Sequence, residues 1–150
     1  MDFYTDGDAQ YDPGQLRLLA AHIADDVDIV QGYKTKRNDP LHRKVLGGIY
    51  QHTIRALFGL RVRDVDCDFR LIRKSLMDRV TLTRHTGAIC AELMYKTQNA
   101  GARVREVGVT HYFRVYGRSQ IFNVPRLVAS VVQLAQLWWE LVAVPKRKAR

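Results

Sequence analysis

Residues 27–58 read VDIVQGYKTKRNDPLHRKVLGGIYQHTIRALF, and this stretch determines which class of fold is expected. Its first six residues, VDIVQG, are interpreted as a buried strand. The basic segment that follows, YKTKRND, is interpreted as a loop. Asp39 and Pro40 then supply an N-cap residue and a proline at the first helical position, so a helix is expected to begin there. One strand followed by one helix is the repeating unit of an α/β protein.

The helix after Pro40 is expected to be amphipathic, because apolar residues recur at helical spacing and mostly basic residues lie opposite them. The apolar set is Leu41, Val45, Ile49, Ile54, Leu57 and Phe58, and the opposite set is His42, Arg43, Lys44, Gln51 and Arg55.

The rest of the chain continues the alternation of strands and helices. Residues 2–5 read as a strand end, residues 12–24 as a helix, residues 87–101 as a helix ending on Gly101, residues 102–117 as one or two strands, and residues 124–144 as a final helix. Strands separated by helices predict an α/β sheet.

The segment DVDCDFRLIRK, residues 64–74, alternates strictly between polar and apolar residues up to Leu71. Side chains of a strand alternate between its two faces, so Asp64, Asp66, Asp68 and Arg70 are expected to share one face. Two interpretations stay open. The acidic face is either a solvated sheet surface or, since helices usually cover both faces of an α/β sheet, the wall of a cleft.

The turn DGD, residues 6–8, places two carboxylates a few residues after the chain begins. Carboxylates in such a turn at a strand's end can bind one hard divalent cation, Mg²⁺ or Mn²⁺, while most Asp-Gly-Asp turns bind no metal. Open α/β sheets bind ligands beyond the carboxyl ends of their strands, and that location favours the metal hypothesis here.

The charge of the chain points to an anionic partner. Its 24 Lys and Arg residues exceed 15 Asp and Glu, which gives a formal net charge of +9. A nucleic acid, a nucleotide and an anionic membrane all fit this charge. Because basic residues are scattered and no nucleic-acid-binding motif is found, a nucleic-acid-binding module is the least favoured. Cys67 and Cys90 form no C-x-x-C pair and are expected to be core residues of a cytoplasmic protein.

Four separated motifs resemble, in order, the catalytic half of family 2 glycosyltransferases, in particular the dolichol-phosphate mannose synthase-like, polyprenyl-phosphate branch. They are YTDGDAQYDP, GYK with Arg37, DVDCDFRLIRK and HYFRVYGRSQIF. The resemblance implies a partial, Rossmann-like GT-A fold. It also implies a glycosyltransferase of the hexosyltransferase type, which moves a sugar from a nucleotide-sugar donor to a lipid-linked acceptor such as polyprenyl phosphate. Residues 1–122 would be the catalytic portion.

The same resemblance assigns roles to individual residues. Asp6 and Asp8 would bind the metal that bridges the donor diphosphate, with Gln10 as a third contact. Phosphate-binding residues would be Lys34, Arg37, Arg43, Arg114, Arg118 and Ser119, the last three on a segment that closes over the diphosphate with Gly117 as pivot. Gln120 departs from the family pattern, which often has lysine there, and this puts the donor clamp in doubt.

The acceptor decides whether a general base is needed. A phosphate acceptor is already anionic, whereas a hydroxyl acceptor would require a base. Candidates for that base are Asp66, Asp68 and Glu92, where Glu92 is equally well an ordinary helical glutamate.

The end of the chain, residues 123–150, is expected to form an amphipathic helix and a basic tail. Ser130, Gln133, Gln136 and Glu140 would share its polar side, and the rest is mostly apolar. One interpretation is a helix at the anionic inner face of the membrane, which would make the protein peripheral. The other is a helix packed on the protein core or on a partner subunit.

Only Met1 to Thr5 precede the DGD turn, whereas a nucleotide-binding βαβ unit takes upwards of ~30 residues. The chain is therefore expected to be a fragment of a glycosyltransferase, or to be completed by another subunit or by a homo-oligomer. As a fragment it would bind a nucleotide sugar weakly and show negligible transfer.

Overall fold

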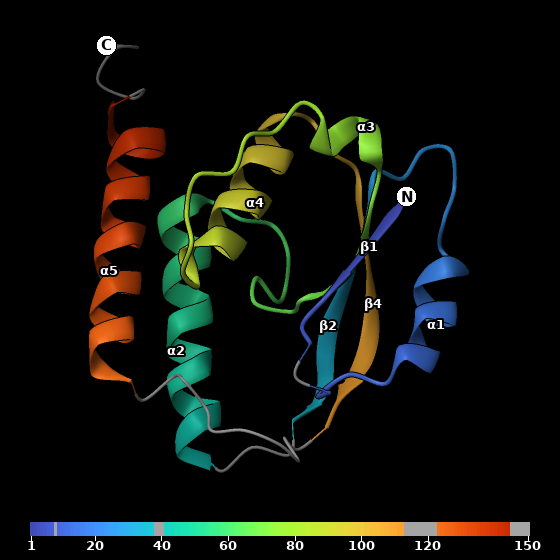
Figure 1. Cartoon of the computed structure of the whole chain (residues 1–150), viewed down its shortest axis with the longest axis horizontal. Helices are drawn as coiled ribbons and strands as arrows, with labels where there is room; N and C mark the ends of the chain where they lie inside the picture. The colour runs from blue at the N-terminus through green and yellow to red at the C-terminus, as the bar shows by residue number, and fades with distance from the viewer. Residues whose placement is uncertain (8, 38–40, 113–122, 145–150) are drawn as a thin grey trace.

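The computed structural model of the chain describes residues 1–7, 9–37, 41–112 and 123–144, apart from the side chains of residues 36, 37, 42 and 43. Its strands and helices mostly alternate, as the sequence predicts, and the short helix at residues 74–77 was not predicted (Figure 1). In chain order they are β1 (Asp2–Thr5), a 3-10 turn (Pro13–Gln15), α1 (Leu16–Ala20), β2 (Ile29–Arg37), α2 (Leu41–Phe58), β3 (Phe69–Ile72), α3 (Lys74–Met77), α4 (Ala88–Asn99), β4 (Val104–His111), α5 (Val124–Trp138) and a π-helical turn (Trp139–Ala143).

Local signals account for several of these boundaries. The Asp12 side chain accepts a hydrogen bond from the Gly14 backbone N–H at 2.8 Å, which caps the helical segment that follows. That segment ends at Ala20, earlier than the expected residue 24. Gly59 and Gly101 adopt positive φ values of 64° and 80° just after α2 and α4, a conformation that glycine adopts without steric cost.

The four strands form one mixed sheet in the order β1-β3-β2-β4, so the α/β class is confirmed. β2 and β4 are parallel, whereas β3 runs antiparallel to both β1 and β2. The segment expected to be a basic loop after residue 32 is instead strand as far as Arg37. The reason is tertiary: β4 pairs alongside it, with Arg37 opposite His111, and supplies the backbone partners that a strand needs.

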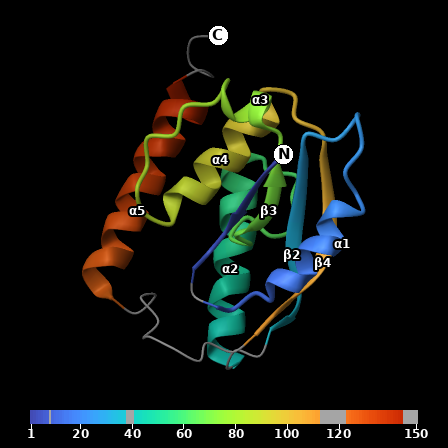
Figure 2. The ribbon, with the colours of Figure 1, turned by 45° about the vertical axis from the view of Figure 1, so that its right-hand side comes forward.

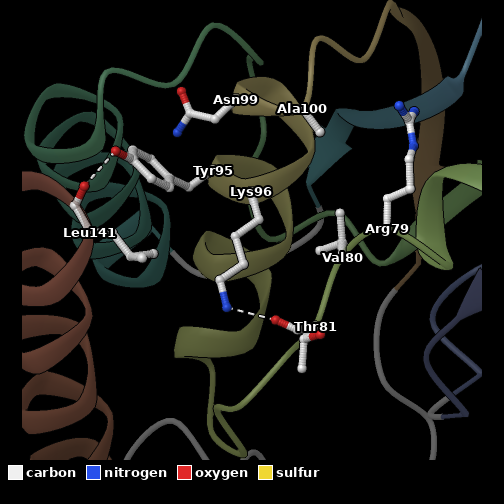
Figure 3. A pocket seen from close by; sticks show the side chains of 8 residues that line it. All are labelled: Arg79, Val80, Thr81, Tyr95, Lys96, Asn99, Ala100 and Leu141. Atoms are coloured by element: carbon white, nitrogen blue, oxygen red, sulfur yellow. Dashed lines mark hydrogen bonds between the residues drawn. The ribbon is translucent and has the colours of Figure 1, made fainter. Parts of the chain in front are cut away.

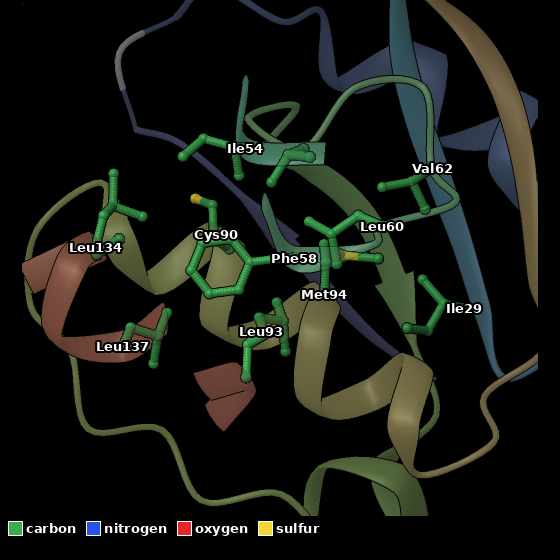
Figure 4. Close-up of a cluster of buried hydrophobic side chains, with 14 of the residues drawn as sticks. Ile29, Ile54, Phe58, Leu60, Val62, Cys90, Leu93, Met94, Leu134 and Leu137 are labelled. Carbon is green, nitrogen blue, oxygen red and sulfur yellow. The ribbon is translucent and has the colours of Figure 1, made fainter. Parts of the chain in front are cut away.

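Helices cover both faces of the sheet, as Figure 2 shows. On one face α2, α4 and α5 enclose the larger core, which includes Ile29, Ile54, Phe58, Leu93, Met94, Leu134 and Leu137 (Figure 4). On the other face α1 and the preceding turn cover a smaller core of Tyr11, Leu19, Val27, Val30, Cys67, Phe69, Leu71, Val107 and Val109. Cys67 and Cys90 are both buried and free, as expected of core cysteines.

The structure corrects the sequence prediction for the acidic stretch before β3. Only residues 69–72 pair as a strand, and residues 64–68 form a loop. Backbone groups of residues 64, 65 and 67 bond to side chains of Gln31, Gln51 and Arg70 rather than to a neighbouring strand, while the Asp68 carbonyl still accepts a hydrogen bond from Asp6 N–H beside β1. Phe69 and Leu71 do share the smaller core, while Arg70 points to Met94 of α4 on the opposite face.

Candidate active site

The carboxyl ends of three strands lie at the same end of the sheet. β1 and β2 both run antiparallel to β3, and β4 runs parallel to β2, so all three finish together at the lower end in Figure 1. Asp6 follows β1 directly, and Tyr112 follows β4. Ligands of open α/β sheets bind beyond this end of the strands.

A backbone hydrogen bond joins the turn that begins at Asp6 to the loop of residues 64–68, here called the acidic loop. The Asp6 N–H donates to the Asp68 carbonyl oxygen at 3.2 Å. This bond continues the β1–β3 ladder one residue past the pair Thr5 and Phe69. Two motifs that are far apart in the sequence therefore meet in space.

The residues after Asp6 connect this turn to the end of β4. Gln10 is buried, its side-chain amide donates to the Tyr112 carbonyl oxygen at 3.1 Å, and its own carbonyl accepts from the Tyr112 N–H at 2.8 Å. Ala9 has a φ of 58°, a left-handed conformation that costs a non-glycine residue about 1 kcal/mol. Strain of this kind is often retained where a turn has a function.

Asp64 is held by its surroundings. Its carboxylate accepts a hydrogen bond from the Lys34 backbone N–H at 3.3 Å and another from the Gln51 side-chain amide. The Gln51 amide oxygen accepts from Val65 N–H at 3.1 Å, and the Gln31 amide bridges the Asp64 and Cys67 carbonyls at 3.1 and 3.0 Å. Asp64 thus shapes the loop.

Asp68 is paired with a buried arginine. The Arg70 guanidinium, whose side chain is fully buried, lies 2.7 Å from the Asp68 carboxylate and also donates to the Cys67 carbonyl at 2.8 Å. The Cys90 thiol of α4 donates to the same carboxylate at 3.3 Å. Burial, followed by the charge of Asp68, raises the pKa of the Cys90 thiol well above its usual value, so the thiol stays protonated and can donate.

Asp66 is the carboxylate of the loop that remains available. Within the part of the chain that the structure describes, no donor forms a hydrogen bond with the Asp66 carboxylate, although Lys34 Nζ donates to the Asp66 backbone carbonyl at 2.9 Å. Burial raises the pKa of Asp66 to about 7; Lys34 opposes this rise, and the charges of Asp64 and Asp68 add to it. A carboxyl group with such a pKa can exchange a proton near neutral pH.

Glu92 is surrounded by hydrogen-bond donors of the protein, and its carboxylate is not exposed to a ligand. Its fully buried carboxylate accepts hydrogen bonds at 2.9 Å from Thr83 N–H, Thr83 Oγ1–H and Arg84 N–H, and it pairs with Lys96 at 2.6 Å. Although burial opposes it, this set of donors lowers the pKa of Glu92 to about 2. Glu92 anchors residues 83–84 to α4.

Of the predicted phosphate-binding residues, Lys34 is described and borders the acidic loop. Arg37 ends β2 and Arg43 lies in the first turn of α2, but their side chains are outside the described part, as are residues Arg114, Arg118 and Ser119.

The metal prediction is not tested by the geometry. Asp8 lies outside the described residues, and among those that are described no three His, Cys, Asp or Glu side chains come close enough to hold an ion. Asp6 is exposed at the carboxyl end of β1, and its carboxylate is a hard oxygen donor of the kind that Mg²⁺ and Mn²⁺ prefer.

A hollow of about 350 Å³ lies elsewhere, between α4, the chain after α3 and the π-helical turn (Figure 3). Its Lys96 side chain is already engaged by the Thr81 carbonyl and by Glu92. A smaller cavity of about 60 Å³ borders Tyr4, Asp68 and Cys90 and has an otherwise apolar lining.

Several residues that build the site have no signal in the sequence. Gln31 and Gln51 act only because β2 and α2 bring them against the acidic loop, and Tyr50 is recognisable only from its proximity to that loop. Burial, with the charges of Asp66, Cys90 and Asp68, raises the Tyr50 pKa far above its usual range. Arg70 could have been singled out as the basic member of an otherwise acidic alternating set.

These features define an α/β domain in which an acidic turn and an acidic loop meet at the ligand-binding end of the sheet. No protein-family profile matches the chain. The chain is 25% identical over 135 residues to dodecaprenyl-phosphate galacturonate synthase of Rhizobium johnstonii, an alignment that covers 86% of this chain and 38% of that protein. The similarity supports a relation to glycosyltransferases at the level of the broad class, and the chain spans well under half the length of this relative.

Proposed function

We propose that this chain forms the catalytic part of a glycosyltransferase that moves a sugar from a nucleotide-sugar donor to polyprenyl phosphate. The hydrogen bond from Asp6 N–H to the Asp68 carbonyl carries the proposal, because it joins the turn expected to bind the donor to the loop expected to face the acceptor. The Rhizobium relative supports the acceptor class, since its name includes dodecaprenyl phosphate.

In the proposed reaction an oxygen of the acceptor phosphate attacks the anomeric carbon of the sugar. The bond between that carbon and the diphosphate oxygen breaks, and the nucleoside diphosphate leaves with the electron pair. No proton has to be removed from an anionic phosphate. The demand on the protein is therefore electrostatic, and positive charge must be close to the leaving diphosphate.

Asp6 and Asp8, with Gln10 as a further oxygen donor, would hold a divalent cation that supplies part of this charge. Lys34 would contribute from the protein side, since it lies beside the acidic loop and its ammonium group bonds to the Asp66 carbonyl. Arg37, Arg43, Arg114, Arg118 and Ser119 are proposed to complete the diphosphate and acceptor contacts.

Asp66 has two proposed roles that depend on the acceptor. Because its pKa is about 7, a fraction of Asp66 is uncharged at neutral pH, which weakens the repulsion between this loop and an anionic phosphate. For a hydroxyl acceptor the ionised fraction would serve as the general base. Asp64 and Asp68 are positioning residues in either case, because their carboxylates are already hydrogen-bonded.

Donor binding can be tested directly. Mn²⁺ together with a nucleoside diphosphate should raise the melting temperature of the chain, and at about 100 times the dissociation constant the stabilisation is about 2.7 kcal/mol. Asp8→Asn should remove this increment, whereas Asp25→Asn, which removes the same charge from an exposed loop after α1, should keep it. Stabilisation of equal size in both variants would reject the metal ligands.

Transfer is tested with radiolabelled nucleotide sugars and polyprenyl phosphate in detergent. The isolated chain is expected to form little lipid-linked product, as a fragment would, whereas a longer protein that contains it should form product that depends on Mn²⁺ and is lost in Asp8→Asn. If the chain binds none of the nucleoside diphosphates in the thermal assay, the donor class itself is wrong.

A further inference from the structure

Three buried side chains determine the course of the acidic loop, and Gln51 is the one that binds two consecutive residues of it. Gln31 of β2 and Arg70 of β3 contact the backbone of the loop through its carbonyl oxygens. The Gln51 amide of α2 instead uses both of its polar ends. Its nitrogen donates to the Asp64 carboxylate, and its oxygen accepts from Val65 N–H at 3.1 Å. The amide therefore fixes the Asp64 side chain relative to the backbone of the next residue.

The contact between Gln51 and the acidic loop is closed to solvent. Gln51 is 7% exposed, Asp64 is 5% exposed and Val65 is 0% exposed. A buried N–H group or carboxylate that loses its hydrogen-bond partner cannot replace it with bulk water, and leaving such a group unsatisfied is costly. The position of residues 64 and 65 therefore depends on the Gln51 amide.

Asp64 connects this attachment to β2 and to Asp66. The carboxylate oxygen of Asp64 that Gln51 does not bind accepts from Lys34 N–H at 3.3 Å, and the Lys34 ammonium group donates to the Asp66 carbonyl at 2.9 Å. A continuous set of contacts thus leads from α2 to Asp66, whose carboxylate is the one that remains available. Among the described residues no hydrogen bond joins Gln51 to the Asp66 carboxylate, so Gln51 acts on Asp66 through its neighbours.

α2 links the acidic loop to a residue proposed to bind phosphate. It is an 18-residue helix, and no helix of the described residues is long and apolar enough to cross a membrane. It begins at the lower end in Figure 1, where β1, β2 and β4 finish, and Arg43 lies in its first turn, about two turns before Gln51. Ile54 and Phe58, which follow Gln51, are buried in the larger core. Gln51 therefore joins the loop to a helix that is anchored in the core.

We propose that Gln51 is a positioning residue: its amide ties α2 to the acidic loop and so holds Asp66 in place at the candidate site. Its effect on transfer rests on the proposed function, whereas its effect on the position of Asp66 does not. An amide suits this place because one end has to donate to a carboxylate and the other has to accept from an N–H group. Glutamate would supply acceptors alone and face Asp64 with a like charge, and methionine, of similar length, offers no donor.

The titration of Asp66 reports its position and can be followed by carbon-13 NMR of its carboxyl group. The measurement uses the complete chain without nucleotide, metal or lipid. Asp66 of the wild-type chain should titrate at about pH 7, chiefly because it is buried. Gln51→Met should admit water to the loop and lower the midpoint by about one pH unit or more, because hydration favours the charged form.

An exchange of the two polar groups supplies a rescue. Gln51→Glu alone places two carboxylates against each other, whereas the double variant Gln51→Glu, Asp64→Asn keeps the net charge and all three hydrogen bonds. The new amide donates to the new carboxylate and accepts from Lys34 N–H, and the new carboxylate accepts from Val65 N–H. The Asp66 midpoint of the double variant should return to within about half a pH unit of the wild-type value.

Gln15 is the matched control, because its amide also binds by both ends. It accepts from Thr110 N–H at 2.7 Å and donates to the Thr110 carbonyl at 3.0 Å, just before α1. Gln15→Met should destabilise the chain without moving the Asp66 titration. If circular dichroism shows that Gln51→Met does not fold, Gln51→Asn takes its place, since the shorter amide cannot reach both of its partners.

Any of four results would overturn the inference: an ordinary Asp66 midpoint in the wild-type chain, an unchanged midpoint in the folded Gln51 variant, a shift of equal size in Gln15→Met, or no recovery in the double variant. In a longer protein that contains this chain, Gln51→Met should lower kcat for transfer by about tenfold or more and leave the donor KM within about twofold. A moved titration with unchanged transfer would support the positioning of Asp66 by Gln51 and reject the part proposed for Asp66 in the reaction.

Discussion

Asp66 has a strongly raised pKa. Its pKa is 3.8 in an ordinary environment and about 7 in the folded chain. A carboxyl group with a raised folded-state pKa favours the fold while it is protonated, and this stabilisation is lost as the pH rises through the folded pKa. The affected window lies between about pH 4 and about pH 7.

We expect the free energy of unfolding of the wild-type chain to fall across this window relative to that of Asp66→Asn. One pKa unit is worth about 1.4 kcal/mol, and because Asp66 is partly exposed we expect a difference of about 2 kcal/mol over the whole window. Urea unfolding of both proteins at several pH values measures it. Parallel stability curves for the two proteins would show that Asp66 titrates normally.

The contribution of Glu92 to stability depends on pH in the opposite direction. Its lowered pKa means that it stabilises the fold above about pH 4.5, its ordinary pKa, and that this contribution is lost as the pH falls toward about 2. Glu92→Gln leaves Lys96 without its buried partner and turns an amide toward the Thr83 and Arg84 donors. We expect a loss of about 3 kcal/mol at pH 7, measured by urea unfolding.

The control for Glu92 is Glu106→Gln, because the ion-pair partner of Glu106, Arg63, is mostly exposed. This substitution should cost about 1 kcal/mol. A Glu92→Gln variant as stable as the control would mean that Glu92 is not the anchor of residues 83–84.

At the scale of elements, the site depends on how closely β2 approaches β3. A Cβ atom at Gly32 would lie 2.7 Å from the Phe69 carbonyl oxygen and 3.1 Å from Cys67 Sγ and Val109 Cγ2. The missing side chain therefore allows β2, β3 and the acidic loop to pack together.

Gly32→Ala should force these strands apart and destabilise the chain by about 2 kcal/mol. Gly48→Ala is the matched control, because Gly48 lies within α2 and a Cβ there meets nothing within 4 Å. An alanine in that helix should stabilise the chain by about 0.5–1 kcal/mol. Thermal unfolding of both variants tests the contrast, and destabilisation of similar size at both positions would contradict it.

At the scale of the whole molecule, α5 belongs to the same hydrophobic core as the sheet. Leu134 and Leu137 of α5 and Val142 after it are buried with Ile29, Phe58 and Leu93. Deleting α5 would therefore expose the interior as well as remove a surface.

Single substitutions separate the two sides of α5. Leu137 is 1% exposed, and Leu137→Ala should destabilise the chain by about 3 kcal/mol. Val131 is 58% exposed, and Val131→Ala should change the stability by no more than about 0.5 kcal/mol. Equal losses in denaturant unfolding would mean that the outward side of α5 is covered in solution.

Much of the architecture was predictable because periodicity and capping act locally. The strand of residues 2–5, the helix beginning at Asp12 and Pro13, α2 and α4 were all expected from apolar spacing, N-cap residues and terminal glycines. The alternation in DVDCDFRLIRK correctly separated Phe69 and Leu71 from Arg70. Local signals also identified the acidic residues from which the candidate site is built.

Pairing and side-chain environment were decided only by the tertiary structure. Residues 33–37 form a strand because β4 lies beside them, and residues 64–68 form a loop because Gln31, Gln51 and Arg70 bind its backbone. The same long-range contacts make Asp66 the available carboxylate and Glu92 an anchor. Hydrogen bonds between distant residues, and the burial that accompanies them, set pKa values and backbone partners, and neither quantity is encoded in the order of neighbouring residues.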